Sequence, residues 1–152
     1  MIEKKFFIFN KKVYNNFFIK ERFDAGLILK GWEVKSLRFN KGTIINSYIT
    51  IINKKIYLYN FDINPLKTVC SHINFNSKRI KQLLLKKKEI NLLQNYINSQ
   101  GFTIVVIGLF WKKSLCKANI AVVKGKKKYD KRNLLKKKIW NIKKIRLLKK
   151  NI

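Results

Sequence analysis

Short stretches of alternating or continuous apolar residues recur along the chain, and this pattern predicts a protein built mainly from β-strands. Residues Tyr14–Ile28 mix aromatic and β-branched residues with charges, which indicates extended chain. The segment Asp24–Gly26 interrupts this stretch, and we expect Gly26 to form a bulge or a bend. Residues Lys67–Ile80 show no clean periodicity, so we expect a long loop there.

Two β-hairpins are predicted from pairs of strand-like runs. The first joins Asn46–Ile52 to Lys55–Phe61 through a short turn at residues 53–54, which contains no glycine. The second joins Thr103–Trp111 to Cys116–Val123. Polar residues alternate with apolar ones along Cys116–Val123, so we expect one face of that strand to be exposed to solvent.

Two stretches show the periodicity of short helices. In Gly31–Arg38, Val34 and Leu37 stand at i and i+3, so we expect both to face the interior. In Lys87–Gln100 the apolar residues follow an i, i+3, i+7 pattern, and Gly101 stands where a left-handed C-terminal cap belongs.

These elements make at least five short strands and two helices. A small sheet with open edges is prone to aggregate, and closure into a barrel removes the edges. We therefore predict a mainly β fold, a small closed β-barrel with two or three peripheral helices and a basic C-terminal tail. The barrel is expected to span residues 1–123, and the tail residues 124–152.

The charge of the chain points to a polyanionic partner. Among 152 residues there are 36 Lys and Arg but only 7 Asp and Glu, which gives a net charge of +29. Most of the cations are Lys, as expected for an AT-rich genome, but that bias does not account for the scarcity of acids. The tail has fourteen basic residues and one acid, Asp130, and Tyr129 lies among its charges. This composition favours a nucleic acid with exposed bases.

The sequence offers little material for catalysis. His72 is the only histidine, and no carboxylate pair, Cys-His pair or metal-ligand cluster has suitable spacing. Cys70 and Cys116 are expected to be reduced, and Cys116 to be a packed thiol. The longest apolar run, Phe102–Trp111, is about half of the length that spans a membrane. We expect a cytoplasmic protein that is not an enzyme, with no cofactor, metal or membrane anchor.

Several blocks together resemble one known family. They are Gly31–Arg38, Leu83–Leu85 followed by Lys88–Ile90, Leu109–Lys113 and Lys124–Arg132. Their order and spacing resemble the SsrA-binding proteins, also called small protein B, of bacterial trans-translation. The resemblance implies an oligonucleotide-binding-like barrel that grips the tRNA-like domain of transfer-messenger RNA and delivers it to stalled ribosomes. It also implies elongation factor Tu as a partner in the delivery complex, and we expect a monomer.

Six residues are candidates for contacts with this RNA. The resemblance implies Asp24, Leu84, Lys86 and Lys117. The exposed side of the first helix adds Lys35 and Arg38 as phosphate contacts. Simpler roles are also open. Leu84 could belong to the core, Asp24 could hold the local bend, the lysines could be solvated, and Glu33 could pair with either helix cation. The family commonly has Asn where this chain has Lys86, and a hairpin glycine where it has Lys54.

The resemblance also implies that the tail engages the ribosome by entering the empty messenger channel near the decoding centre. The resemblance implies that its contact residues are Lys124, Gly125, Lys126, Lys127, Asp130, Lys131 and Arg132. Tyr129 stands where an aromatic ring could stack on a base, and the apolar positions of the distal helix correspond to Trp140, Leu147 and Leu148. Repulsion among the tail lysines predicts disorder in solution and folding against a polyanionic partner. The resemblance implies that the tail folds as a helix on the ribosome. The alternative is a helix docked on the barrel.

Three other functions remain open. A general ribosome-associated RNA-binding protein or RNA chaperone would have the same charge and the same barrel, but little specificity. A membrane-surface protein is suggested by the mixture of Lys, Leu and Ile in the tail. An RNA-cleaving enzyme would have to rely on His72.

Overall fold

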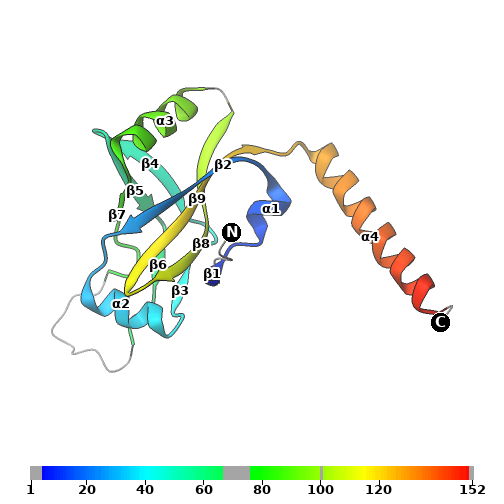
Figure 1. Ribbon diagram of the computed structural model, residues 1–152, viewed down its shortest axis with the longest axis horizontal. Helices are drawn as coiled ribbons and strands as arrows, with labels where there is room; N and C mark the ends of the chain where they lie inside the picture. The colour runs from blue at the N-terminus through cyan, green and yellow to red at the C-terminus, as the bar shows by residue number, and fades with distance from the viewer. Residues whose placement is uncertain (1–4, 67–75, 100, 151–152) are drawn as a thin grey trace.

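The computed structural model describes residues 5–66, 76–99 and 101–150, and Figure 1 shows a strand-rich body from which one long helix projects. The strands in these residues are β1 (Phe6–Phe9), β2 (Phe17–Leu27), β3 (Gly42–Thr43), β4 (Tyr48–Ile52), β5 (Lys55–Tyr59), β6 (Asp62–Ile63), β7 (Lys81–Leu84), β8 (Phe102–Lys112) and β9 (Leu115–Gly125). The helices are α1 (Lys12–Asn16), α2 (Gly31–Arg38), α3 (Lys87–Asn98) and α4 (Lys128–Lys150).

Within the described ranges, seven strands form one antiparallel sheet in the order β1, β8, β9, β2, β7, β5 and β4. Strands β3 and β6 pair separately. The prediction of a mainly β fold is therefore confirmed. Both predicted hairpins are present, as β4–β5 and as β8–β9.

The turn of the β4–β5 hairpin explains how it forms without glycine. Asn53 and Lys54 both have positive φ angles, 48° and 58°. Two successive residues of this kind make a type I′ turn, whose twist matches that of the flanking strands. Asn adopts this conformation readily, whereas a Lys side chain makes it less favourable. The pairing of Ile52 with Lys55 therefore holds residues 53 and 54 in the turn conformation without a glycine.

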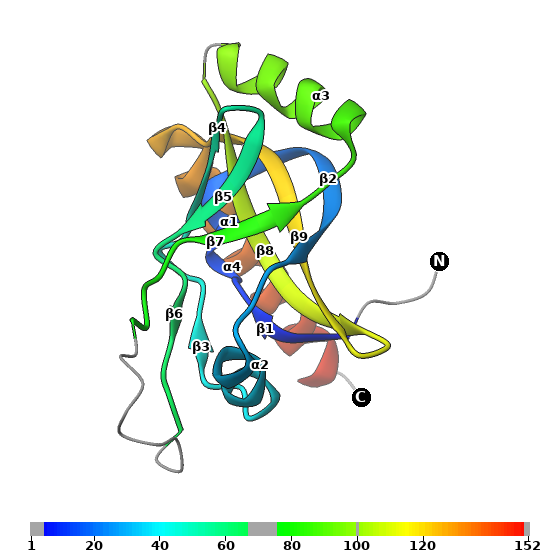
Figure 2. The same cartoon turned by 90° about the vertical axis from the view of Figure 1, so that its left-hand side faces the viewer.

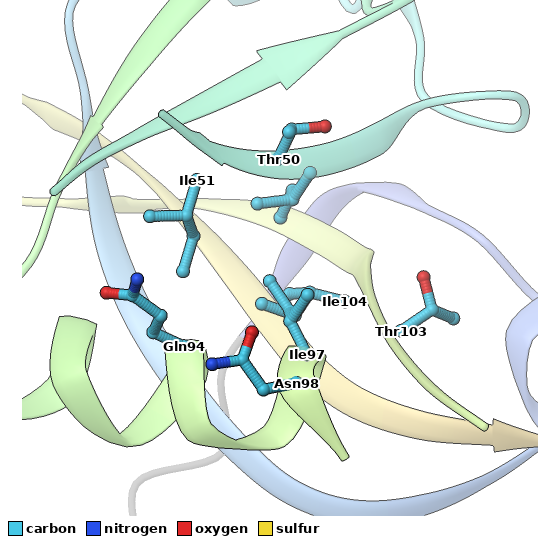
Figure 3. Close-up of a pocket in the computed structure, with 8 residues that line it drawn as sticks. Thr50, Ile51, Gln94, Ile97, Asn98, Thr103 and Ile104 are labelled. Carbon is cyan, nitrogen blue, oxygen red and sulfur yellow. The ribbon is translucent and has the colours of Figure 1, made fainter. Parts of the chain in front are cut away.

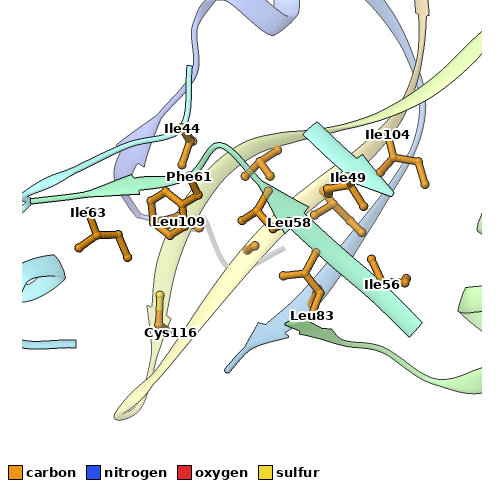
Figure 4. Close-up of a cluster of buried hydrophobic side chains, with 14 of the residues drawn as sticks. Ile44, Ile49, Ile56, Leu58, Phe61, Ile63, Leu83, Ile104, Leu109 and Cys116 are labelled. Atoms are coloured by element: carbon orange, nitrogen blue, oxygen red, sulfur yellow. The ribbon is translucent and has the colours of Figure 1, made fainter. Parts of the chain in front are cut away.

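The main core lies inside the curved sheet and is closed by α2 and α3. Figure 4 shows side chains from several strands meeting there, among them Ile49, Leu58, Leu83 and Ile104. Cys116 is also buried, and burial raises the pKa of its thiol to about 12. A thiol with so high a pKa is not a nucleophile at neutral pH, so the prediction of a packed Cys116 is confirmed.

A second apolar cluster covers part of the outer face of the sheet. Val13 of α1 packs there against Ile107 of β8 and against Ala121 and Val123 of β9. The predicted solvent-exposed face of residues 116–123 is present only in part, because Lys117 is half-buried whereas Ala121 and Val123 are buried against α1. Even Asn119, expected to be wet, is buried.

The N-terminal part of the predicted extended segment is also different. Residues 14–16 belong to α1, which begins after Asn10 accepts a hydrogen bond through Oδ1 from the Lys12 N–H at 3.1 Å. Strand β2 then continues without interruption, and its pairing with β9 is irregular only between Ile19 and Glu21. The predicted break at residues 24–26 is wrong, because β2 is held there by a neighbouring strand on each side.

Helix α2 has the predicted bounds, with Leu37 buried and Val34 partly buried. Glu33 behaves differently from the expectation that it could pair with Lys35 or Arg38. It is fully buried and binds the Arg79 guanidinium through both carboxylate oxygens, at 2.7 and 3.2 Å. Its Oε2 also accepts from the Lys30 N–H at 2.7 Å, which caps the helix.

Helix α3 confirms the second helix prediction. It covers residues 87–98 and buries Leu93. The C-cap is Ser99 in an extended conformation, and Gly101, with a φ of +84°, lies two residues beyond it, so the left-handed residue does not directly cap the helix as predicted. Residue Gln100 lies outside the described residues. Figure 2 shows α3 across one end of the sheet and α2 near the other end.

Strand β7 was not identified from the sequence because its first residue is a lysine that turns inward. Lys81 is fully buried, and its Nζ donates to the carbonyl oxygens of Phe61 at 2.5 Å and Ser77 at 3.0 Å. Burial lowers the pKa of Lys81 to about 8. The loop predicted before β7 falls mainly on residues 67–75, which lie outside the described residues.

Helix α4 projects from the body and does not pack along it (Figure 1). Its predicted apolar stripe, Leu135, Ile139 and Ile142, is exposed, in contrast to the alternative of a helix docked on the barrel. No helix in the described part of the chain is long and apolar enough to cross a membrane.

Candidate nucleic-acid interface

One residue of β2 brings the separated candidate positions together. Gly26 is in register with Lys117 of β9 on one side and with Leu84 of β7 on the other. Paired residues in a sheet project their side chains to the same face. Lys117 and Leu84, which are 33 positions apart in sequence, therefore flank Gly26 on the outer face of the sheet.

Asp24 lies on this same face, two residues before Gly26. It is opposite Asn119, whose Nδ2 donates to Asp24 Oδ1 at 2.7 Å. Asn119 is buried, whereas Asp24 is exposed. The amide orients the carboxylate and offsets part of the repulsion that an acid would have toward phosphate. Asp24 does not hold a bend, since β2 has none at this position.

Leu84 is not a core residue. Its side chain is 53% exposed, whereas its neighbour Leu83 points inward and is buried. An exposed leucine between polar groups offers an apolar contact for a base or a ribose. A Cβ atom at Gly26 would lie 3.4 Å from the Leu84 Cβ, so the glycine leaves the flank of Leu84 open. We refer to Asp24, Gly26, Leu84, Lys117 and Asn119 as the Gly26 surface.

The other three candidates lie beside this surface or away from it. Lys86 follows β7 by two residues and is the N-cap of α3. Its backbone N–H donates to Glu89 Oε2 at 2.9 Å, and its side chain is exposed. Lys35 and Arg38 are exposed on α2. Glu33 does not neutralise them, because it is buried against Arg79.

The root of the tail is part of the sheet. Lys124 and Gly125 pair with Phe18 and Phe17, so β9 continues two residues into the segment expected to be tail. Lys126 then binds α1 twice. Its N–H donates to the Asn16 carbonyl oxygen at 2.9 Å and its Nζ to the Tyr14 carbonyl oxygen at 2.7 Å. These bonds set the direction in which the chain leaves the body.

Asp130 has a clear local role at the start of α4. Its Oδ2 accepts from the Lys127 N–H at 3.2 Å, which satisfies a donor at the helix N-terminus. Its negative charge is also favourable there because of the helix dipole. Asp130 therefore stabilises the beginning of α4, whatever else it contacts.

The remaining tail candidates lie along α4. Tyr129, Trp140 and Leu147 are largely exposed, and the Lys144 Nζ lies 5.6 Å from the Trp140 ring centroid. Arg132 is exposed, and Lys131 is partly buried. Leu148 lies within the helix, but its side chain is not among those described.

Among the described residues, no three His, Cys, Asp or Glu side chains are grouped so that they could hold a metal ion. His72 lies outside the described residues, so the structure says nothing about a role for it.

Comparison with known proteins assigns the chain to a family. The family described as SmpB protein matches residues 7–150. A protein named SsrA-binding protein, from Buchnera aphidicola subsp. Schizaphis graminum (strain Sg), is 47% identical over 142 residues, which cover 93% of this chain and 87% of that protein. The chain belongs to the SmpB protein family. The matched residues include the Gly26 surface and all of α4.

A solved structure supports the same assignment to the SmpB protein family. It is titled "tmRNA-SmpB: a journey to the center of the bacterial ribosome" and matches with a TM-score of 0.66 and 30% identity. The match covers 80% of this chain and 85% of that chain. The resemblance stated from the sequence blocks is therefore confirmed.

Sequence analysis missed two residues of this face. Asn119 was interpreted only as a polar residue on a wet face, and Arg22 was not singled out. Both lie on the outer face because they are in register with Asp24 and Ala121, respectively. A strand alignment of β2 with β9 would have identified them, but single-strand periodicity does not contain that information.

Proposed function

We propose that this protein is the RNA-binding adaptor of trans-translation. Its body binds the tRNA-like domain of transfer-messenger RNA and delivers it to stalled ribosomes, where α4 enters the empty messenger channel. The observation that carries the proposal is the register at Gly26, which places Asp24, Leu84 and Lys117 on one face. The relative named SsrA-binding protein and the tmRNA–SmpB structure support it.

The Gly26 surface combines the contacts that a folded RNA requires. Lys117 provides a charge for phosphate, Leu84 an apolar contact, and Asp24 an acceptor for a ribose hydroxyl or a base amine. Lys86, Lys35 and Arg38 extend the positive field to either side. The Asp24 carboxylate, which Asn119 holds in place, favours recognition of one RNA shape over binding that depends on charge alone.

We propose further that the body forms a closed oligonucleotide-binding-like barrel. The recorded pairing ends at β4, but Ile51 of β4 and Ile104 of β8 line one cavity of about 230 Å³, together with Ile97 of α3 (Figure 3). We propose that β4 closes against β8 and that α3 covers the seam. Closure would protect the edge of β4 from pairing with other chains.

The body and the tail have different binding partners in this proposal. The body, residues 1–123, holds the RNA, and residues 124–152 engage the ribosome. Along the tail, the lysines and Arg132 contact ribosomal RNA phosphates, Tyr129 stacks on a base, and the apolar face with Trp140, Leu147 and Leu148 packs in the channel. Free in solution, the tail is disordered, and it folds as a helix on the ribosome.

The remaining features of the proposal follow from this role. The protein acts as a monomer in the cytoplasm, together with elongation factor Tu, and carries out no catalysis itself. A general RNA-binding protein or RNA chaperone is the second candidate, because a net charge of +29 would bind any RNA.

A competition assay at physiological salt separates these two functions. The labelled tRNA-like domain is displaced by the same RNA, by an ordinary tRNA and by a size-matched duplex. An adaptor is displaced best by the tRNA-like domain. Equal displacement by all three would establish a general RNA-binding protein.

Two lysine variants locate the site in the same assay. Lys117→Ala should weaken binding of the tRNA-like domain by about tenfold and reduce the salt slope by about one. The matched control is Lys55→Ala, which removes an exposed lysine at the tip of the β4–β5 hairpin. If both variants weaken binding equally, the Gly26 surface is not the binding site.

A further inference from the structure

A row of aromatic rings continues the outer face of the sheet beyond the Gly26 surface. Phe110 of β8 is in register with Lys117, and Phe6 of β1 is in register with Phe110. The rings of Phe6 and Phe110 meet edge to face, with centroids 6.1 Å apart. The face that carries Leu84 and Lys117 therefore ends in aromatic side chains.

The row then turns along β1 toward α1. Phe9 stacks on Phe6 with centroids 5.6 Å apart, and Tyr14 lies beside Phe9 at 5.7 Å. The guanidinium of Arg22, on the outer face of β2, lies 5.7 Å from the Tyr14 ring centroid. We call Phe6, Phe9, Tyr14 and Phe110 the aromatic stripe. It connects Lys117 at one end with Arg22 at the other.

The sheet is shaped to carry this stripe. Gly108 lies beneath it, and a Cβ atom there would be 2.7 Å from a carbon of the Phe6 ring. Any larger residue would displace Phe6. Phe110 is buried and packs edge to face against Phe6 from the neighbouring strand, whereas Phe9 is 40% and Tyr14 38% exposed. The stripe therefore presents two rings to solvent on a supported base.

The charges around the stripe identify the kind of partner. Residues 5–20 contain four lysines and no acid. Arg22 contacts Tyr14 directly, and the Lys126 Nζ lies 2.7 Å from the Tyr14 carbonyl oxygen. An apolar protein partner would gain nothing from cations around the aromatic rings. An RNA strand carries a phosphate beside every base, so bases stacked on the rings would bring phosphates close to these cations.

We propose that the aromatic stripe is a binding site for unpaired nucleotides, whose bases stack on Phe9 and Tyr14 while Arg22 and Lys117 contact the adjacent phosphates. Paired RNA does not fit this site, because its bases are stacked on one another and present only edges. The Gly26 surface would then hold the folded part of an RNA and the stripe an adjoining single-stranded part. The inference rests on the proposed function only in taking RNA as the partner.

The test uses the full-length protein and a single-stranded RNA of about ten nucleotides that contains 2-aminopurine, whose fluorescence is quenched on stacking. The double variant Phe9→Leu/Tyr14→Leu keeps apolar volume but removes the rings. It should bind this RNA about tenfold or more weakly and lose the quenching, with an unchanged salt slope. A duplex of the same length should bind as well as it does to the unaltered protein.

Two further variants exclude trivial causes. Phe9→Trp/Tyr14→Trp restores aromatic surface and should restore both binding and quenching. Tyr48→Leu removes an exposed ring that stacks on Tyr59 at the β4 edge, and it should change neither. Thermal unfolding of each variant shows whether a loss of binding reflects a loss of folding.

Several outcomes would overturn the inference. They are unchanged binding by the leucine variant, equal loss of single-stranded and duplex RNA, or failure of the tryptophan variant to restore quenching. Self-association of the unaltered protein that the leucine variant abolishes, with RNA binding unchanged, would assign the stripe to a second copy. The proposed function is scored separately by preference for the tRNA-like domain, which uses the Gly26 surface.

Discussion

The body and α4 are both strongly basic, but they treat their apolar side chains in opposite ways. In the body, residues such as Leu58, Phe61 and Leu109 are fully buried, and α1 covers part of the outer face as well. In α4, Ile139 and Trp140 are mostly exposed. Burial of apolar area is the main source of folding free energy, so the body can be stable alone whereas α4 gains little.

This difference suits two kinds of recognition. A shape-specific RNA site requires side chains that are already positioned, as Asn119 positions Asp24 within the sheet. A helix whose apolar face lacks a partner in its own chain can gain that burial from another molecule, and it folds when it binds. The body thus presents an RNA site that is already positioned, whereas α4 gains its apolar burial only when it binds.

Deleting residues 128–152 should produce the largest effect and separate the two regions. The cut leaves Lys124, Gly125 and the Lys126 contacts with α1 in place. We expect binding of the tRNA-like domain to stay within a few-fold, because the Gly26 surface is untouched, and tagging on stalled ribosomes to be abolished. The measurements are RNA affinity and tagged product in a reconstituted translation reaction.

A different result for RNA affinity or for tagging would change the roles assigned to the body and to α4. If the truncated protein loses RNA affinity and tagging to the same extent, α4 takes part in gripping the RNA. If tagging survives, α4 does not sense the messenger channel.

Removing one apolar side chain from each region should sharpen the contrast. Leu58→Ala removes a fully buried side chain and should lower the free energy of unfolding by roughly 2 to 5 kcal/mol. Ile139→Ala removes an exposed one and should change it by less than about 0.5 kcal/mol. Urea unfolding of both variants provides the comparison. A large effect of Ile139→Ala would mean that α4 packs on the body in solution.

Much of the fold could be predicted from local pattern. Helix α2 has the expected bounds because Val34 and Leu37 repeat at helical spacing, and both hairpins follow from strand-like runs separated by short turns. These signals lie within a few residues of each other, so one sequence contains them.

The candidate site could be predicted only in part, because strand register assembles it. Asp24 and Leu84 came from resemblance, but Asn119 is 95 residues from Asp24 in sequence, and nothing local marks them as partners. Lys81 was equally hidden, since a lysine in a strand normally indicates a solvent-exposed position. A row of five residues joins the Gly26 surface to the aromatic stripe across five strands, and it consists of Phe6, Phe110, Lys117, Gly26 and Leu84.

The buried ion pair between Glu33 and Arg79 tests the stability of the body alone, because it lies in the body and not in α4. Arg79 binds the fully buried Glu33 through two hydrogen bonds. Arg79→Met leaves that carboxylate buried without its cation and should lower the free energy of unfolding by about 3 kcal/mol, at the lower end for such pairs because Arg79 is 27% exposed. Lys78→Met, a neighbouring exposed lysine, is the matched control and should have little effect.

A double variant checks the cause of this loss. Adding Glu33→Gln to Arg79→Met removes the uncompensated charge and should recover part of the stability. If the double variant is less stable than Arg79→Met, the hydrogen bond from the Lys30 N–H to the Glu33 carboxylate, which caps α2, contributes more stability than the buried unpaired charge removes.

The smallest expected effect is a pH dependence that belongs to the body alone. Lys81 has a folded-state pKa of about 8, lowered from 10.5 mainly by burial. Between these two values the unfolded chain binds more protons than the folded one, so this group makes the protein more stable as the pH rises from about 8 toward 10.5. The gain should be between about 1 and 3 kcal/mol.

Lys81→Met isolates this contribution from that of the many other lysines and tyrosines. The difference in unfolding free energy between the original protein and the variant should change across that pH range and be flat below pH 8, where Lys81 is protonated in both states. Urea unfolding at several pH values measures it. A difference that is constant at all pH values would mean that Lys81 keeps its charge in the folded body, stabilised by the carbonyl oxygens of Phe61 and Ser77.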